Sequence, residues 1–490
     1  MNEKVMSTEK KLKIVNKYLG KLMDVAEKGT KERKYDLVLS AVSAYCSIQY
    51  SINQIYTDKK SEEILLEISR QLIRFSDEYK ADSNVVLFYD GFGLDLRGWA
   101  ATFAKGITDA GFKLIYMTRK SAAGTIPHVE KEVKAGNGEI VYFDTKISYQ
   151  KWIEDIDRVF KKYHPGVAFF YTNPNDVCAT VVFDAYKDKV KRIQVDLTDH
   201  AFWIGTNAFD YIAESRGVGV SNALYHRGID KEKIRKMDCC LYINTDVDDT
   251  PLPFDIEKEK YIFSGGSIYK TLGDDELLFY KMVNHILSAH EDVKFLFAGG
   301  GDDSELKTII GKYPGRAFHI DERSDFYRLF EHCVFFLNTY PMFGGLMMQF
   351  AANAGKIPLT LKHGSDHEGI LIDQESRGIE FDTIEEAMQE ADRLIDDKNY
   401  RENKEKGLNG AVVSQKDFSD ILKKLIVNGE TGDSFDEIPE IDTSDFRREY
   451  INRLDTDAVL MKSIATKSNK NLLFLFPTLF CKRIIKRIKK

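Results

Sequence analysis

The residues best suited to chemistry stand in short loops that follow predicted buried strands. The loop after residues 261–264 holds Gly265, Gly266 and Lys270, and the loop after residues 334–337 holds the pair Gly344 and Gly345. Glycines let a phosphate approach backbone N–H groups, and a lysine can neutralise a phosphate oxygen. A Gly-Gly pair after a strand is also common in ordinary tight turns. Taken together, the two loops predict a site for the diphosphate of a nucleotide at one sheet edge.

Other residues of the same sheet edge are expected to contact this ligand. The loop 362–368 brings two histidines and two carboxylates together, but their spacing matches no strong pattern of metal ligands, so we predict no metal and no cofactor. A polar surface loop is the alternative for this segment. The expected contacts, beyond the five residues above, are Ser267, Tyr269, Gly300, Thr339, Leu346, His363 and Glu368.

Candidate bases come from the first half of the chain. Asp199 and His200 follow the predicted strand 192–195, and Trp203 comes soon after them, where its ring could stack on a sugar. Adjacent side chains usually diverge, so adjacency alone does not predict a dyad, and a single loop histidine is often structural. The first Gly-rich loop supplies Asp90 and Asp95 as alternative bases. Its members expected on the acceptor side are Gly93, Asp95 and Arg97, of which Arg97 could simply pair with an aspartate.

Short apolar runs alternate with helical segments from residue 84 onward, which predicts an α/β fold with two doubly wound, Rossmann-like domains and a cleft between them. Apolar residues recur at helical spacing before that point. The expected divisions are a helical region at 1–83, a first Rossmann-like domain at 84–245, a second at 246–428 with a crossover helix, and an acidic linker with a basic tail at 429–490. The run 218–221 is expected to be a strand of the first sheet.

Composition narrows the class of protein. The 490 residues carry a formal net charge of −7, which argues against a general nucleic-acid binder. The six cysteines include no C-x-x-C spacing, so neither a zinc ribbon nor a disulfide framework is predicted. The charged N-terminus predicts no signal peptide, and no apolar run is long enough to span a bilayer. We therefore expect a cytoplasmic protein.

The two ends of the chain suggest partners. Leu472–Lys490 is apolar and then basic, which suits the surface of an anionic membrane. A disordered tail or a helix that binds a partner are alternatives. The helical region at the N-terminus could bind a protein partner or could be only a packing appendage.

The plan of residues 84 to about 427 resembles the GT-B glycosyltransferases. More narrowly, the segments 267–270, 337–345 and 362–368 resemble parts of the O-GlcNAc-transferase-like family, and bacterial capsule and surface-glycan transferases share much of this pattern. The resemblance implies a nucleotide-sugar held mainly by the second domain, with Lys270 on its diphosphate and the Gly344–Gly345 loop beside it.

One departure from the GT-B pattern bears on mechanism. Retaining members often carry two glutamates eight positions apart near this loop, where this chain has Met342 and Phe350. The resemblance then implies an inverting, metal-independent reaction, which needs a base for the acceptor hydroxyl and cations or N–H groups for the leaving diphosphate.

The resulting prediction is a glycosyltransferase that moves a sugar from a UDP-sugar to a surface polysaccharide or a lipid-linked glycan, peripheral at the inner face of the membrane. One alternative acceptor is a protein side chain, presented by the helical N-terminus. Another alternative is a non-catalytic partner subunit of the same fold.

Overall fold

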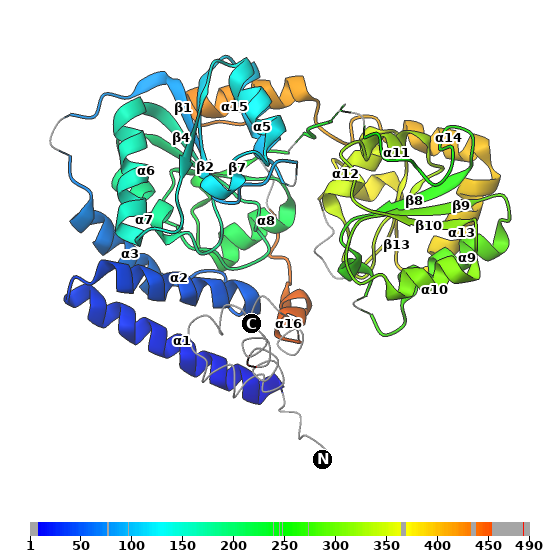
Figure 1. Ribbon diagram of the computed structural model, residues 1–490, viewed down its shortest axis with the longest axis horizontal. Coiled ribbons are helices and arrows are strands. Elements are labelled where there is room, and N and C mark those ends of the chain that lie inside the picture. The colour runs from blue at the N-terminus through cyan, green and yellow to red at the C-terminus, as the bar shows by residue number, and fades with distance from the viewer. Residues whose placement is uncertain are drawn as a thin grey trace. The chain divides into compact units, whose positions relative to one another are not determined.

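The computed structural model describes residues 8–75, 78–96, 98–238, 240–244, 246, 248–272, 274–363, 369–432, 438–452 and 484. The chain divides into two compact units (Figure 1). Unit 1 comprises Met1–Met237 and Ser419–Lys490, and unit 2 comprises Asp238–Phe418. The division thus falls some residues before the expected boundary at 245, and the chain returns to unit 1 within the crossover helix.

A seven-stranded parallel sheet forms the centre of unit 1, in the order β3-β2-β1-β4-β5-β6-β7. Its inner strands are buried along most of their length, as strands covered by helices on both faces must be. The order reverses between β1 and β4. The strands are β1 (Asp82–Asp90), β2 (Lys113–Arg119), β3 (Glu139–Phe143), β4 (Pro165–Tyr171), β5 (Lys191–Val195), β6 (Tyr211–Glu214) and β7 (Ile234–Lys236).

The N-terminal helices belong to the same hydrophobic core as this sheet's own helices. Val15, Leu39 and Leu65 share one apolar cluster with Phe160 and Phe183. This region is therefore a packed layer of unit 1. The helices of unit 1 are α1 (Thr8–Lys31), α2 (Tyr35–Ile52), α3 (Lys59–Leu72), α4 (Ala100–Asp109), α5 (Pro127–Ala135), α6 (Tyr149–Tyr163), α7 (Val177–Ala185), α8 (Gly217–Ser221), α15 (Gln415–Asn428, shared with the end of unit 2) and α16 (Ser444–Asn452).

Unit 2 has a six-stranded sheet in the order β10-β9-β8-β11-β12-β13, which is the strand order of a Rossmann fold. The order reverses between β8 and β11. Its strands are β8 (Tyr261–Gly265), β9 (Lys294–Ala298), β10 (Ala317–Ile320), β11 (Phe336–Leu337), β12 (Pro358–Leu361) and β13 (Glu380–Phe381). Its helices are α9 (Leu278–Ala289), α10 (Ser304–Lys312), α11 (Tyr327–His332), α12 (Gly345–Asn353), α13 (Ile384–Asp396) and α14 (Lys398–Lys406).

The prediction of a strand at 218–221 was wrong, because this run is the helix α8. A short apolar run has no periodicity that separates a strand from a buried helical turn. The strands β6 and β7 and the helix α16 were not predicted. The first two are very short, and α16 lies in a segment whose acidic composition resembles a linker.

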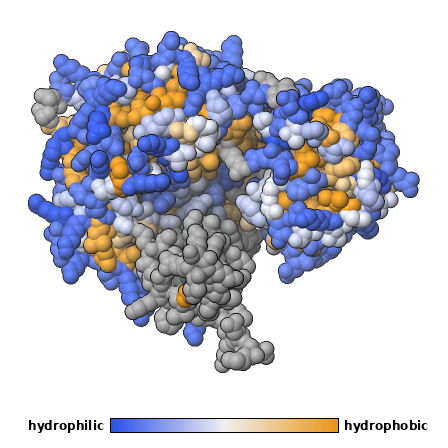
Figure 2. Space-filling view, in the orientation of Figure 1, coloured by the Kyte–Doolittle hydropathy of each residue, from blue (hydrophilic) through white to orange (hydrophobic). Residues whose placement is uncertain are grey.

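On the face shown in Figure 2, both units are mainly hydrophilic, with small apolar patches between charged residues. None of the helices in the described ranges combines the length and the apolar character needed to cross a bilayer. The predicted membrane-binding tail, Leu472–Lys490, lies outside the described residues except for Ile484.

Candidate functional site

Three loops of unit 2 meet at the carboxyl ends of its strands, where the strand order reverses between β8 and β11. The N–H of Met342 donates to the carbonyl of Lys270 (3.2 Å), and the N–H of Ile268 donates to the carbonyl of Gly300 (3.0 Å). The ammonium of Lys270 donates to the carbonyl of Phe343 (3.1 Å). These bonds join the loops after β8, β9 and β11, so Lys270 lies beside the turn that leads into Gly344 and Gly345.

Two of these loops touch through glycine backbones. A Cβ at Gly299 would lie 1.9 Å from the carbonyl oxygen of Gly266, and the φ angle of Gly299 is +148°, which other residues rarely adopt. His319 Nε2 lies 2.7 Å from the carbonyl oxygen of Gly299 and holds the loop from the other side. The loop after β9 can therefore lie against the loop after β8 only because glycine stands at 299.

Asn338, which the sequence did not single out, organises the third loop. Its Oδ1 accepts hydrogen bonds from the N–H groups of Thr339 (3.0 Å) and Gly344 (2.9 Å), and its Nδ2 donates to the hydroxyl of Thr360 (3.2 Å). The hydroxyl of Thr339 donates to the carbonyl of Met342 (2.7 Å). The proton of the Thr339 hydroxyl is thus used within the loop.

The loop ends in the N-terminus of α12. Gly344 is the N-cap residue and provides no side-chain cap, and Gly345 and Leu346 form the first turn. The first N–H groups of a helix have no partner within it, and the helix dipole makes this end attractive to anions. The residues expected to bind a diphosphate are therefore placed at an end that suits one.

The loop after β12 also reaches this edge. His363 Nδ1 lies 3.4 Å from the hydroxyl of Tyr340, and the two rings pack edge to face at 5.4 Å between centroids. Tyr269, in the loop after β8, is 56 % exposed. Glu368 and residues 364–367 lie outside the described residues. Within the described ranges no group of three or more histidines, cysteines and carboxylates is placed to hold a metal ion.

In unit 1, the structure corrects the role expected for Asp90. This carboxylate is fully buried and accepts hydrogen bonds from Tyr116 (2.7 Å) and from the N–H groups of Phe92 (2.8 Å) and Gly93 (3.0 Å). Burial raises the pKa of Asp90, which the hydrogen bonds oppose. Asp90 therefore holds the first Gly-rich loop in place and has no exposed oxygen to act as a base.

Asp95 and Gly93 likewise shape this loop. Asp95 accepts hydrogen bonds from the N–H groups of His128 and Val129 (both 3.1 Å), at the start of α5, and its Oδ2 lies 2.5 Å from His128 Nδ1. A Cβ on Gly93 would lie 3.0 Å from the side chain of Arg119. Asp95 therefore acts as a cap for α5, and Arg97 lies outside the described residues.

Asp199 and His200 do interact, although their adjacency in the chain did not predict it. Their Oδ1 and Nδ1 atoms are 3.3 Å apart. Arg216 binds Asp199 through Nε (2.5 Å) and Nη2 (2.7 Å). Burial alone would raise the pKa of Asp199, but the Arg216 guanidinium holds it well below its usual range. Asp199 therefore stays ionised, while the half-buried imidazole of His200 packs against Phe446 of α16.

The expectation that Trp203 stacks on a sugar was wrong. Its side chain is buried, its Nε1 donates to Asp196 (2.9 Å), and the guanidinium of Arg227 lies 4.7 Å from its ring centroid. Burial raises the pKa of Asp196 to about 6. Neither carboxyl oxygen of nearby Glu214 has a hydrogen-bond partner among the described residues. Trp203 thus belongs to a buried cluster of charged groups.

Sequence reasoning missed the members of this cluster. It also missed Asn338 and its three hydrogen bonds, which we call the Asn338 hub. Arg216, Glu214 and Asp196 stand singly near strand ends and form no motif. Asn338 directly follows a buried strand and precedes a Gly-rich turn, and this position was the one available signal.

No model of a protein family matches the chain, and no curated protein matches it in sequence. Solved structures do match. A protein of Listeria monocytogenes assigned as a UDP-N-acetylglucosamine 2-epimerase has a TM-score of 0.52 at 10% identity and covers 72% of this chain and 100% of its own. A glycosyltransferase of Rickettsia africae has a TM-score of 0.51 at 11% identity and covers 71% of this chain and 99% of its own.

A further UDP-N-acetylglucosamine 2-epimerase has a TM-score of 0.50 at 13% identity and covers 73% of this chain and 100% of its own. Likeness at this level of identity concerns the fold. The matches are consistent with an architecture of two parallel sheets. The chain therefore has the two-unit, Rossmann-like GT-B fold, with an additional helical layer on unit 1.

Proposed function

We propose that the protein is a glycosyltransferase that transfers a sugar from a nucleotide-sugar, most simply a UDP-sugar, to an acceptor hydroxyl. The observation that carries this proposal is the meeting of the three loops of unit 2 at the reversal of strand order. This edge is where parallel α/β sheets bind nucleotides. It joins a lysine, close-packed glycines and a helix N-terminus, all of which suit a diphosphate.

The donor side is assigned to unit 2. Lys270 and the first turn of α12 would neutralise the diphosphate as the bond to the sugar breaks. The exposed ring of Tyr269 and the side chain of His363 flank the same loops and would contact the base, ribose or sugar. The Asn338 hub would keep the loop in this geometry before the donor binds.

His200 is the preferred base. It takes the proton of the acceptor hydroxyl as that oxygen attacks the anomeric carbon, and the diphosphate leaves with the bonding electrons. Asp199, ionised by its contact with Arg216, orients the imidazole and stabilises its charged form. Two other candidate bases are less suitable, because Asp90 is fully buried and Asp199 is bound by Arg216.

Met342 and Phe350 stand where the family resemblance calls for the two glutamates of retaining members, and for this reason we propose inversion, in a reaction that uses no metal. Phe350 is buried among the aromatic rings of Phe326 and Phe330. The acceptor proposed is a surface polysaccharide or a lipid-linked glycan at the inner face of the membrane, reached through the basic tail. A protein acceptor and a non-catalytic partner subunit are the alternatives.

Calorimetry with UDP, followed by an assay of UDP release from UDP-sugars with glycan acceptors, tests this proposal. Binding and turnover support a transferase. Binding without turnover on any acceptor supports the partner subunit, and absence of UDP binding overturns the proposal. The stereochemistry of the product, read by NMR coupling constants, decides between inversion and retention.

A second candidate is sugar epimerisation, because two of the matched structures are UDP-N-acetylglucosamine 2-epimerases whose full length is covered. The two activities separate without an acceptor. An epimerase converts UDP-N-acetylglucosamine to its C2 epimer, whereas a transferase leaves C2 unchanged. Conversion at C2 in the absence of acceptor would favour the epimerase.

A further inference from the structure

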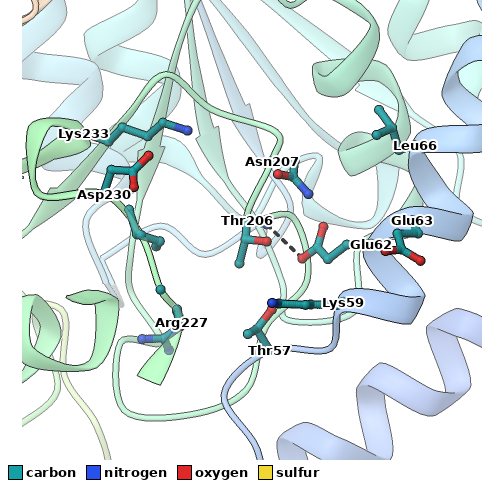
Figure 3. Close-up of a pocket in the computed structure, with 12 residues that line it drawn as sticks. Thr57, Lys59, Glu62, Glu63, Leu66, Thr206, Asn207, Arg227, Asp230 and Lys233 are labelled. Atoms are coloured by element: carbon teal, nitrogen blue, oxygen red, sulfur yellow. Dashed lines mark hydrogen bonds between the residues drawn. The ribbon is translucent and has the colours of Figure 1, made fainter. Parts of the chain in front are cut away.

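Unit 1 contains a cavity of about 350 Å³ that none of the residues assigned above to donor or base explains. Figure 3 shows its lining side chains, which come from the start of α3, from the loop before β6 and from the segment before β7. Since β6 and β7 are parallel, these last two segments lie near the amino-terminal ends of the strands. The proposed base lies at the carboxyl end of β5, so the cavity is a different site of unit 1, and Arg227 of its lining links the two by donating to the carbonyl of Asp199 (3.0 Å).

Glu62 gives the cavity an unmet hydrogen-bonding need. Its side chain is 3% exposed, and its Oε1 accepts hydrogen bonds from the N–H groups of Gly205 (2.8 Å) and Thr206 (2.9 Å). Oε2 has no partner among the described residues, and Figure 3 shows the side chain of Glu62 among those that line the cavity. Burial also raises the pKa of Glu62. A buried carboxyl oxygen without a partner favours a ligand that brings a hydroxyl or another donor group.

The lining holds cationic side chains and carboxyl groups in equal number. Neither Lys59 nor Lys233 has an ion-pair partner within the described part of the chain, so both can bind a ligand oxygen. An anion would be attracted by the cations and repelled by the carboxylates, and a cation would meet the reverse. The cations in the lining are Lys59, Arg227 and Lys233, and the carboxylates are Glu62, Glu63 and Asp230.

The remaining lining suits a neutral ligand rich in hydroxyl groups. Thr57, Thr206 and Asn207 can each donate and accept hydrogen bonds, and Leu66 and Ile229 add apolar surface. The volume falls within the range of about 300–1,000 Å³ found for small-molecule sites. Sugars combine closely spaced donors and acceptors with apolar C–H faces, and no net charge is needed to bind them.

We propose that this cavity is a binding site for a neutral carbohydrate of one or two sugar units, with Glu62 accepting or sharing a hydrogen bond with a sugar hydroxyl. The site is separate from the donor loops, and its existence does not depend on the proposed transfer reaction. In a protein that elongates a glycan, such a site would hold a part of the chain distant from the reacting end.

Calorimetry of the full chain with maltose, lactose and N,N′-diacetylchitobiose tests the proposal, with inorganic phosphate and glutamate as charged probes. At least one disaccharide is expected to bind. Glu62→Gln replaces the acceptor oxygen by an amide nitrogen and should weaken binding by at least about tenfold. Asn207→Trp fills the cavity from an exposed position and should abolish binding even if Glu62→Gln alters folding. Lys60→Ala, next to the lining residue Lys59 but outside the cavity, is the matched control and should bind as the wild type does.

Three outcomes would overturn the inference: no disaccharide binds, binding survives both Glu62→Gln and Asn207→Trp, or phosphate or glutamate binds in place of the sugars. A parallel titration with UDP separates this inference from the proposed function. Sugar binding without UDP binding would overturn only the transferase proposal, and UDP binding without sugar binding would overturn only the carbohydrate site.

Discussion

Single residues carry most of the chemical content of the donor edge, and Lys270 contributes a positive charge to it. Its ammonium lies beside the turn before α12 and donates to a neutral carbonyl, that of Phe343. A diphosphate would offer a much stronger, charged acceptor.

Lys270→Ala should weaken UDP binding by about tenfold or more, since a charge-assisted hydrogen bond contributes about 1.5–3 kcal/mol. Calorimetry with UDP measures the change. Lys307→Ala, an exposed lysine of α10 that pairs with Asp303, serves as the control. Equal UDP affinity in Lys270→Ala and the wild type would remove Lys270 from the site.

His200→Ala should lower the rate of sugar transfer by a factor of about 10²–10⁴ and leave UDP affinity unchanged, because a general base acts on the acceptor and UDP is assigned to unit 2. Asp199→Asn should lower the rate through the orientation of His200, with a shift in the pH profile. Steady-state assays from pH 5 to 9 measure both. A wild-type rate in His200→Ala would exclude it as the base.

Asp184 of α7 makes stability depend on pH. Burial raises its pKa to about 7, and its Oδ2 has no hydrogen-bond partner among the described residues. The unfolded state releases this proton near pH 4, so the folded state holds more protons between about pH 4 and 7 and loses stability as pH rises through that window.

Asp184→Asn removes this titration. Its unfolding free energy relative to the wild type should rise from pH 4 to 7 and then stay level, with a gain on the order of 1–3 kcal/mol at pH 8. Urea unfolding at a series of pH values gives the difference. A difference that does not vary with pH would show that Asp184 titrates normally.

At the scale of elements, the donor edge depends on loops that touch through backbone. The contact of Gly299 with Gly266 leaves no room for a Cβ, whereas a Cβ at Gly300 would have no atom within 4 Å. These neighbours form a matched pair of positions in one loop.

Gly299→Ala should destabilise the protein by more than about 2 kcal/mol and weaken UDP binding, because the alanine must push the two loops apart and adopt a left-handed φ. Gly300→Ala should have a small effect on stability. Thermal unfolding with and without UDP compares the two variants. Similar melting temperatures for both would mean that the loops do not need to touch.

Much of this architecture could be predicted because long helices and strands have clear sequence patterns. The helix predicted at 149–163 is α6 to the residue, and the strand predicted at 294–298 is β9. Amphipathic periodicity and buried apolar runs carry such elements. The run 218–221 was misassigned, and β6, β7 and α16 were missed, because their short or polar sequences have no period of their own and their packing partners decide their structure.

The site was predictable only in part, for a related reason. Glycines and a lysine after strands predict a phosphate loop from sequence, and the structure brings these loops together at one sheet edge. Binding of a diphosphate there stays a prediction. Other features depend on segments that are distant in the chain. They are the burial of Asp90 and Trp203, the contact of Arg216 with Asp199, and the hydrogen bonds of the Glu62 carboxyl group. A lone polar residue gives no sign of which segments will enclose it.

At the scale of the whole molecule, unit 2 is one continuous stretch of chain, whereas unit 1 is built from two. The hydrophobic clusters of unit 2 lie entirely within residues 241–412. In unit 1, Lys191 donates hydrogen bonds to the carbonyls of Ile426 and Val427 (both 2.8 Å), which ties β5 to the end of α15.

Residues 238–418 produced alone should fold cooperatively and bind UDP with an affinity close to that of the full chain. The fragment 1–237 should be markedly less stable than the full chain, since it lacks α15 and α16. Denaturant unfolding and calorimetry of both fragments check this. A fragment 238–418 that is folded but does not bind UDP would show that unit 2 does not hold the nucleotide by itself.

The return of the chain to unit 1 at Ser419 has a consequence for biosynthesis. A ribosome releases the sequence from the N-terminus onward, so unit 2 is complete before the last helices of unit 1 have emerged. The seven-stranded sheet therefore lacks the contact between β5 and α15 until the whole of unit 2 has been translated. Newly made protein is expected to be most exposed to chaperones and proteases during this interval. A stop codon shortly after residue 418 would leave unit 2 complete and unit 1 without α15 and α16.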